Sequence, residues 1–168
     1  FQTYTPEASK NISDSRTNEE QIYFVGNAMI DSCLRIQSKF QDPKIWKEIS
    51  LKPQKYLIVT IHRPVNVDEA IQFEKTLNAI LENSHNLPIV FPVHPRTAEL
   101  LKKLSFETDN LILINPLGYL EFNYLVLNAK AVLTDSGGIT EETTVLEVPC
   151  LTLRENTERP ETAKLGTN

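Results

Sequence analysis

Short apolar runs alternate with amphipathic segments along most of the chain. Five runs are nearly continuous in apolar residues, as is typical of strands buried on both faces of a sheet, and they cover residues 56–62, 88–94, 110–115, 131–135 and 149–154. Between them, apolar side chains recur at helical spacing and predict helices that begin near Asp68 and Glu69 or cover residues 97–103, 120–128 and 138–146. Because strands and helices alternate, we predict an α/β fold built on a doubly wound, Rossmann-like parallel sheet.

The rest of the chain carries weaker patterns. Residues 1–21 are polar and irregular, and a further short strand is expected to begin over residues 22–25. Residues 42–53 are expected to link the domain or to line its edge.

The composition is that of an ordinary globular protein and mainly excludes function classes. The 168 residues are 40% hydrophobic and 23% charged, which suits one domain with a buried core. Seventeen basic against 22 acidic residues give a net charge of −5 without a basic cluster, so we expect no nucleic-acid partner. No apolar run approaches the ~18 residues of a membrane span and no signal peptide is evident, so we expect no membrane association. Cys33 and Cys150 lie in apolar contexts without metal-ligand spacing, and we expect reduced thiols and a cytoplasmic location.

Residues 131–142, AVLTDSGGITEE, carry the clearest chemical signal. An apolar run ends in Asp-Ser-Gly-Gly ahead of a helical segment. Such a turn presents backbone N–H groups at the positive end of the helix, where they can bind a phosphate. Ser136 is a candidate N-cap, but Ile139 stands where a capping box needs Glu or Gln, so the donors are left for a ligand. The alternative is an ordinary capped turn, because the match is neither the full GxGxxG nor the P-loop pattern.

Polar residues gather at the carboxyl ends of the predicted strands, where doubly wound sheets bind their ligands. In chain order they are His62 with Arg63, His94 with its neighbours, Asn115, residues 135–138 and residues 154–159. Two histidines could also indicate a metal site, but arginines follow them and cationic neighbours repel a metal ion. We therefore expect an anion site, with no metal and no cofactor.

Five motifs follow one another in order along nearly the whole chain. They are FVGNAMID (residues 24–31), VTIHRPVNVD (59–68), FPVHPRT (91–97), LTDSGGITEE (133–142) and LRENTERPET followed by GTN (153–168). Together they resemble the non-hydrolysing UDP-N-acetylglucosamine 2-epimerases, which share the two-domain architecture of GT-B glycosyltransferases. The resemblance implies that residues 1–21 end an amino-terminal domain and its linker. Residues 22–168 would be the UDP-binding carboxyl-terminal domain without its final helices, and the start at Phe1 likewise suggests a piece of a longer protein.

The resemblance implies a UDP site on the Gly-Gly turn. In that family the diphosphate lies over Ser136, Gly137 and Gly138, and Glu142 accepts the ribose hydroxyls. Glu142 is six residues beyond Ser136, about 9 Å along a helix, and its side chain leans back toward the phosphate end. Considered without the family, Glu142 would better suit a solvated or salt-bridged helix face.

Two further residues correspond to nucleotide contacts of the family. Phe122 stands at the uracil pocket, although alone it would be assigned to the core, and Arg159 matches a position that contacts the nucleotide-sugar. A guanidinium can fork onto phosphate oxygens, whereas a surface ion pair is the plainer alternative for Arg159. Leu117 and Thr140 depart from the family, which has Gln at the first position in some members and at the second in most.

Three residues that follow strands match active-site positions of the family. His62 corresponds to a histidine close to the sugar and diphosphate, and an ordinary pKa near ~6.5 lets such a group donate to a leaving phosphate or relay a proton. Arg63 and His94 resemble positions that, in bacterial members, help bind a second, activating UDP-N-acetylglucosamine. Pro64 stands where members vary.

The activity implied by the resemblance is the interconversion of UDP-N-acetylglucosamine and UDP-N-acetylmannosamine for polysaccharide synthesis. UDP is eliminated to leave a 2-acetamidoglucal and is then added back. The family's acid and base carboxylates belong to the amino-terminal domain, so the chain is expected to be a UDP-binding half that is nearly inactive alone. UDP-N-acetylglucosamine and UDP are the expected ligands, and a homodimer is expected at full length.

Three alternatives stay open. A GT-B glycosyltransferase would use the same nucleotide cradle, although HRPVNVD and TERPE argue against it. The hydrolysing epimerases generally diverge around TERPE. A nucleotide-sugar-binding module without catalysis is the non-enzymatic alternative.

Overall fold

The computed structural model describes residues 1–168 except residues 4, 16, 105, 107 and 158–159 and the side chain of Arg96. The chain divides into two compact units, Phe1–Ile36 and Gln37–Asn168. The assignment of residues 1–21 to a preceding domain stays a prediction.

The first unit contains more regular structure than the sequence pattern predicted. Strand β1 (Gln2–Thr3) pairs in parallel with β2 (Tyr23–Phe24), and the helical segments are α1 (Pro6–Asp14), the 3₁₀ turn η1 (Glu19–Gln21) and α2 (Ala28–Ile36). The expectation of an irregular stretch before residue 22 is wrong, because Thr5 caps α1 by accepting from the N–H of Ala8 at 3.0 Å. Pro6 occupies the first helical position, where its missing N–H costs nothing.

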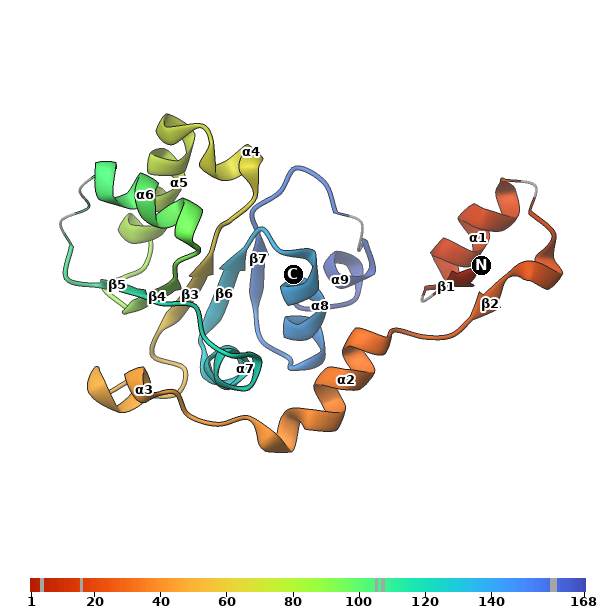
Figure 1. Cartoon of the computed structure of the whole chain (residues 1–168), viewed down its shortest axis with the longest axis horizontal. Coiled ribbons are helices and arrows are strands. Elements are labelled where there is room, and N and C mark those ends of the chain that lie inside the picture. The colour runs from red at the N-terminus through yellow and green to blue at the C-terminus, as the bar shows by residue number, and fades with distance from the viewer. Residues whose placement is uncertain (4, 16, 105, 107, 158–159) are drawn as a thin grey trace. The chain divides into compact units, whose positions relative to one another are not determined.

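The second unit is built on a parallel sheet of five strands in the order β5-β4-β3-β6-β7 (Figure 1). The strands are β3 (Leu57–Thr60), β4 (Ile89–Pro92), β5 (Leu111–Ile114), β6 (Ala131–Thr134) and β7 (Cys150–Thr152). Each predicted strand is present but shorter than its apolar run, because the flanking residues turn toward the next helix. Leu113 on the edge strand β5 is 49% exposed, so the expectation that every strand is buried on both faces is wrong at this edge.

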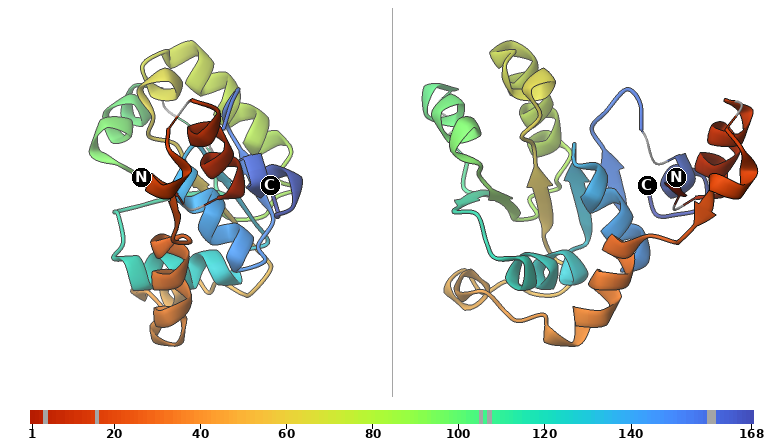
Figure 2. Two further views of the ribbon diagram at one scale, coloured as in Figure 1. Left: turned by 90° about the vertical axis from the view of Figure 1, so that its right-hand side faces the viewer. Right: turned by 45° about the vertical axis from the view of Figure 1, so that its right-hand side comes forward.

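The strand order places a switch point between β3 and β6, since the chain runs outward from β3 to β5 and then crosses back to β6. The connecting helices are α5 (Ala70–Glu82), α6 (Pro95–Leu104), α7 (Tyr119–Asn128) and α8 (Gly137–Val145). Helices α5 and α6 lie beside each other and away from α7 and α8, as Figure 1 and Figure 2 show. This arrangement is the doubly wound parallel sheet predicted from the sequence.

Shorter helical segments complete the second unit. They are η2 (Gln37–Lys39), α3 (Lys44–Glu48), α4 (Pro64–Val67) and α9 (Pro160–Lys164). The segment expected to link or edge the domain therefore contains a helix, α3. Helix α4 follows β3 directly, and Pro64 at its first position fixes the start of the turn.

The core on one face of the sheet is formed by alternate strand residues and helix α5. Val59, Phe91 and Leu133 point to this face and pack with Phe73 and Leu77 of α5. Fully burying an aromatic or aliphatic side chain contributes roughly 1.5 to 3 kcal/mol, so this cluster is the main anchor of α5. The intervening strand residues Ile58, Val90 and Val132 are also fully buried, as expected for a sheet covered on both faces.

Gly166 explains why the chain carries a GTN sequence near residue 168. A Cβ at Gly166 would lie 2.5 Å from the carbonyl oxygen of Thr162 and 2.6 Å from the side chain of Thr144, so only glycine fits. The close approach lets the N–H of Cys150 donate to Thr167 O at 3.0 Å, and the Asn168 amide donates to Thr140 O at 3.2 Å. The segment therefore ties α8, β7 and α9 together.

Candidate functional site

The candidate site lies where β3 and β6, neighbours at the centre of the sheet, end side by side. Thr60 pairs with Thr134 in register, and the two buried hydroxyls are 2.6 Å apart. Thr134 Oγ1 also accepts from the N–H of Ser136 at 3.0 Å. The end of β3 and the start of the Gly-Gly turn are thus joined by side-chain hydrogen bonds as well as by the strand ladder.

Asp135 is the most heavily bonded side chain of the site and is completely buried. Its Oδ2 accepts from the N–H groups of His62 at 3.1 Å and Arg63 at 2.9 Å and from Asn66 Nδ2 at 2.9 Å. Burial would raise the pKa of Asp135, but hydrogen bonds from the His62 and Asn66 side chains and the two backbone N–H groups lower it to about 2. Asp135 is therefore a fixed negative charge next to His62.

His62 stands over this carboxylate and is about half exposed. Its Nδ1 lies 3.1 Å from Asp135 Oδ1, and 47% of its side chain is accessible. The hydrogen bond to Asp135 raises the pKa of His62, opposed by partial burial and by the nearby Arg63 charge. The predicted active-site histidine is thus anchored on one ring nitrogen and open to solvent elsewhere.

The Gly-Gly turn begins helix α8 in the way that the sequence predicted. Ser136 is the N-cap residue, with φ −89° and ψ 122°, and its side chain makes no capping hydrogen bond. Within the described part of the chain, the N–H groups of Gly137 and Gly138 meet no acceptor. The positive end of α8 can therefore bind an anion with backbone donors alone.

Glu142 lies on the second turn of α8 and is only 7% exposed, so the solvated helix face considered for it is wrong. Tyr119 Oη donates to its Oε1 at 2.7 Å. Burial raises the pKa of Glu142, while the hydrogen bonds from Tyr119 and Asn123 lower it and the neighbouring Glu141 carboxylate raises it further. The carboxylate is therefore held by side chains of α7 rather than by solvent.

Helix α7 contributes the residues that lie beside Glu142. Gly118 is its N-cap residue, and Tyr119 and Phe122 follow on its first turn, with Phe122 half-buried. Leu117, just before the helix, lines a cavity of about 660 Å³ that also includes Asn115. The predicted uracil residue is therefore on the helix that holds Glu142.

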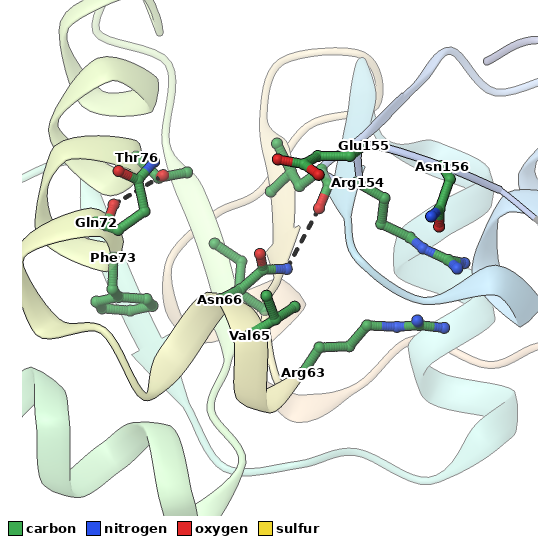
Figure 3. Close-up of a pocket in the computed structure, with 11 residues that line it drawn as sticks. Arg63, Val65, Asn66, Gln72, Phe73, Thr76, Arg154, Glu155 and Asn156 are labelled. Carbon is green, nitrogen blue, oxygen red and sulfur yellow. Dashed lines mark hydrogen bonds between the residues drawn. The ribbon is translucent and has the colours of Figure 1, made fainter.

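A second cavity, of about 600 Å³, lies between α4, α5 and the chain after β7 (Figure 3). Arg63 and Arg154 both line it, and their guanidinium groups extend to the same side, away from Phe73. The predicted residue His94 is exposed after β4 and is not among the lining residues. Arg159, predicted to contact the nucleotide-sugar, lies outside the described residues.

Some residues of the site were not assigned a role from the sequence. The sequence pattern marks Asp135 only as part of the turn and predicts no role for Asn66, Tyr119 or Asn123. The signal for Asp135 is its place directly after β6, but its partner β3 is more than seventy residues earlier, so only the strand order brings them together. Among the described residues there is no cluster of three metal-ligating side chains and no helix long and apolar enough to cross a membrane.

The chain is similar to known epimerases over nearly its whole length. A profile of the UDP-N-acetylglucosamine 2-epimerase family matches residues 2–168. The UDP-N-acetylglucosamine 2-epimerase of Methanococcus maripaludis is 39% identical over 174 residues, which cover 98% of this chain and 48% of that protein.

Solved structures show the same likeness. The Methanocaldococcus jannaschii UDP-GlcNAc 2-epimerase in complex with UDP-GlcNAc and UDP superimposes with a TM-score of 0.85 at 35% identity, covering 98% of this chain and 48% of that one. The Neisseria meningitidis enzyme bound to UDP-GlcNAc gives a TM-score of 0.80 at 28% identity, with coverage of 98% and 48%. The chain spans about half the length of the relatives that it matches. It belongs to the UDP-N-acetylglucosamine 2-epimerase family.

Proposed function

We propose that this chain is the UDP-binding half of a UDP-N-acetylglucosamine 2-epimerase. The observation that carries the proposal is helix α8, whose first turn offers uncapped N–H groups and whose second turn holds the buried Glu142. These groups are spaced to receive a diphosphate and the ribose hydroxyls of one nucleotide. The M. jannaschii relative, which is named as a complex with UDP-GlcNAc and UDP, supports the same ligand.

Each helix-terminus contact supplies only part of the affinity. A charge at an exposed helix end is worth ~0.3 to 1 kcal/mol, and up to ~2 in a partly buried geometry. The remaining affinity would come from three contacts. Glu142 would accept the ribose hydroxyls, Phe122 of α7 would lie against the uracil, and cationic side chains would bind the phosphates. Arg63 and Arg154 extend to one side of the cavity after β7, and Arg159 is the family's own candidate.

In this proposal His62 is the catalytic residue of the half-site. An imidazolium at the end of β3 would donate to the leaving diphosphate as the bond to the sugar breaks and would take the proton back on re-addition. The base that removes the C2 proton would belong to the amino-terminal half of the family. The chain alone is therefore expected to bind UDP but to epimerise almost nothing, and robust epimerisation by the purified chain would contradict this division.

The motif HRPVNVD contributes directly to the cluster around Asp135, because its His62, Arg63 and Asn66 all donate to that carboxylate. A glycosyltransferase half would share the Gly-Gly turn, but the HRPVNVD motif that builds this cluster argues against that class. We therefore favour the epimerase over the glycosyltransferase and over a module without catalysis. Arg63 and His94 stay proposed contacts of an activating second nucleotide-sugar, and the full-length enzyme is proposed to be a cytoplasmic homodimer without a nucleic-acid partner.

Calorimetric titration with UDP tests the proposal, with N-acetylglucosamine as the control ligand. We expect UDP to bind, and we expect Glu142→Gln and Arg159→Ala each to weaken binding about tenfold, because each removes a charge-assisted hydrogen bond. Glu82→Gln, an exposed glutamate at the end of α5, is the matched control and should leave the affinity unchanged. A folded chain that does not bind UDP, or that binds equally well after Glu142→Gln, would show the assignment to be wrong.

A further inference from the structure

We propose that Asp135 is the positioning residue of His62 and holds the imidazole with its hydrogen on Nδ1, so that Nε2 is the nitrogen presented to the ligand. The inference rests on the proposed function, because it concerns the histidine that would meet the diphosphate. It assigns a role to Asp135, a residue to which neither the sequence motifs nor the resemblance to the family gives one.

The first step is the place of the two residues in the sheet. Thr60 and Thr134 are the last paired residues of β3 and β6, and neighbouring strands run about 4.8 Å apart. His62 and Ser136 each lie two residues farther along. The imidazole therefore emerges beside the turn that would hold the phosphates, whereas Asp135 lies one residue before that turn and under the ring.

The second step is the hydrogen-bond inventory of Asp135. The carboxylate is fully buried and accepts from the N–H of Arg63, from Asn66 Nδ2 and from His62 through both its N–H and Nδ1. A carboxylate surrounded by donors stays ionised, and an ionised carboxylate can only accept. The hydrogen in the 3.1 Å contact must therefore belong to His62 Nδ1.

The third step is the consequence for the other ring nitrogen. With Nδ1 committed to Asp135, Nε2 carries a lone pair when His62 is neutral and a hydrogen when it is cationic. The charged groups that face the ring are Asp135 from the end of β6 and Arg63 from the ring's own segment, and they act in opposite directions. The Asp135 contact is the larger influence, so it favours the cation, the form that can donate to a diphosphate oxygen.

The fourth step separates this role from a purely structural one. Asp135 also closes the turn after β3, and Asn66 joins that turn to the end of β7 by donating to Leu153 O at 3.3 Å (Figure 3). If Asp135 only held this turn together, removal of the Asn66 side chain would affect the His62 ring as much as a change of Asp135. A positioning role would change the protonation of His62 only when the carboxylate itself is changed.

Nitrogen chemical shifts of the imidazole rings, followed against pH in the folded chain, provide the test. The chain has three histidines, so His62→Gln identifies the signals of interest and the remaining two serve as internal references. In the unsubstituted chain we expect neutral His62 to be the Nδ1–H tautomer. Finding the Nε2–H tautomer there would overturn the proposal without any variant, including in the case that a variant fails to fold.

Asp135→Asn is the decisive substitution, and Asn66→Ala is its matched control. An amide at residue 135 can donate to Nδ1, so we expect the Nε2–H tautomer, a lower pKa of His62 and about tenfold weaker UDP binding. Asn66→Ala should leave the tautomer unchanged. A folded Asp135→Asn chain that keeps the Nδ1–H tautomer and its pKa would overturn the proposal, as would the same tautomer change in Asn66→Ala.

Addition of UDP separates this inference from the proposed function. If UDP binds and moves the Nε2 signal of His62, both are supported. If UDP binds without moving that signal, the presented nitrogen is wrong while the UDP site stands. If UDP does not bind although the Nδ1–H tautomer is found, the proposed function fails and the ring's anchoring by Asp135 survives without a ligand.

Discussion

Two buried carboxylates near the Gly-Gly turn have opposite electrostatic environments. Asp135 at the end of β6 is fully buried and has its pKa lowered to about 2, whereas Glu142 on α8 is 7% exposed and has its pKa raised. Burial acts on both in the same direction, so it cannot explain the difference. Asp135 accepts hydrogen bonds from two backbone N–H groups and two side chains. Glu142 accepts hydrogen bonds from the side chains of Tyr119 and Asn123, and it lies beside the acidic Glu141. The hydrogen-bond donors therefore decide whether the pKa of each carboxyl is lowered or raised.

This difference also separates the two roles. Asp135 is saturated with internal donors, so a ligand could contact it only by displacing one of them. Glu142 has fewer donors than its oxygens can accept, and the hydroxyls of a ribose could supply more. A saturated carboxylate suits a positioning role, and an unsaturated one suits ligand recognition.

Removal of the saturated carboxylate should have the largest effect on stability. Asp135→Ala leaves the backbone N–H groups of His62 and Arg63 without their acceptor and removes the carboxylate partner of the Asn66 and His62 side chains, so we expect a loss of about 3 to 5 kcal/mol in the free energy of unfolding. Urea unfolding followed by circular dichroism measures it. Glu142→Ala, the comparison variant, should cost clearly less, and equal losses for the two variants would contradict the contrast.

Much of the fold followed from the sequence because it depends on local pattern. The five apolar runs became the five strands, and the helix start at Gly137 fell within one residue of its prediction. Helix α1 was missed because its pattern is polar and its start signal, Thr5 before Pro6, lies in a segment without apolar periodicity. The order of the strands in the sheet could not be predicted from the pattern, because no feature of the β3 sequence indicates that β6 is its neighbour.

The site was less accessible for the same reason. The Gly-Gly turn is a contiguous motif, so its donors could be predicted, whereas Asp135 meets His62 across more than seventy residues. Thr140, Glu141, Glu142 and Thr143 form an unbroken polar run that is nevertheless buried. Polarity predicts exposure, but the hydroxyls of Thr140 and Thr143 donate to backbone carbonyls of α8 itself, and Glu142 accepts from Tyr119 of α7, so these groups are bonded although they are buried.

Acid should distinguish the two carboxylates by the sign of their effect. The pKa of Asp135 is lowered from 3.8 to about 2, so its contribution to stability is present above pH 3.8 and is lost as the pH falls toward 2. The difference corresponds to about 2 kcal/mol. The pKa of Glu142 is raised, so the cost of its charge is present at neutral pH and is relieved as the pH falls through its folded-state pKa.

Unfolding free energies measured across this acidic range check the assignment. The unsubstituted chain should lose stability between pH 3.8 and about 2, and Asp135→Asn should lose about 2 kcal/mol less over the same interval. Glu142→Gln should keep that loss but should no longer gain stability on mild acidification. If Asp135→Asn shows the full acid loss, other carboxylates are responsible and the contrast is wrong.

The smallest expected effect comes from making Glu142 still less saturated. Tyr119→Phe removes the 2.7 Å hydrogen bond to Glu142 Oε1 while keeping the ring. Because Tyr119 is 44% exposed, water can replace part of the lost bond, and we expect at most about 1 kcal/mol in stability and a two- to fivefold weaker affinity for UDP. The pKa of Glu142 should rise further. Tyr124→Phe makes the same chemical change on the same helix, where the ring packs edge-on against Trp46, and should leave UDP affinity unchanged. Equal effects of the two variants on titrations with UDP would mean that Tyr119 supports helix α7 rather than the orientation of the carboxylate.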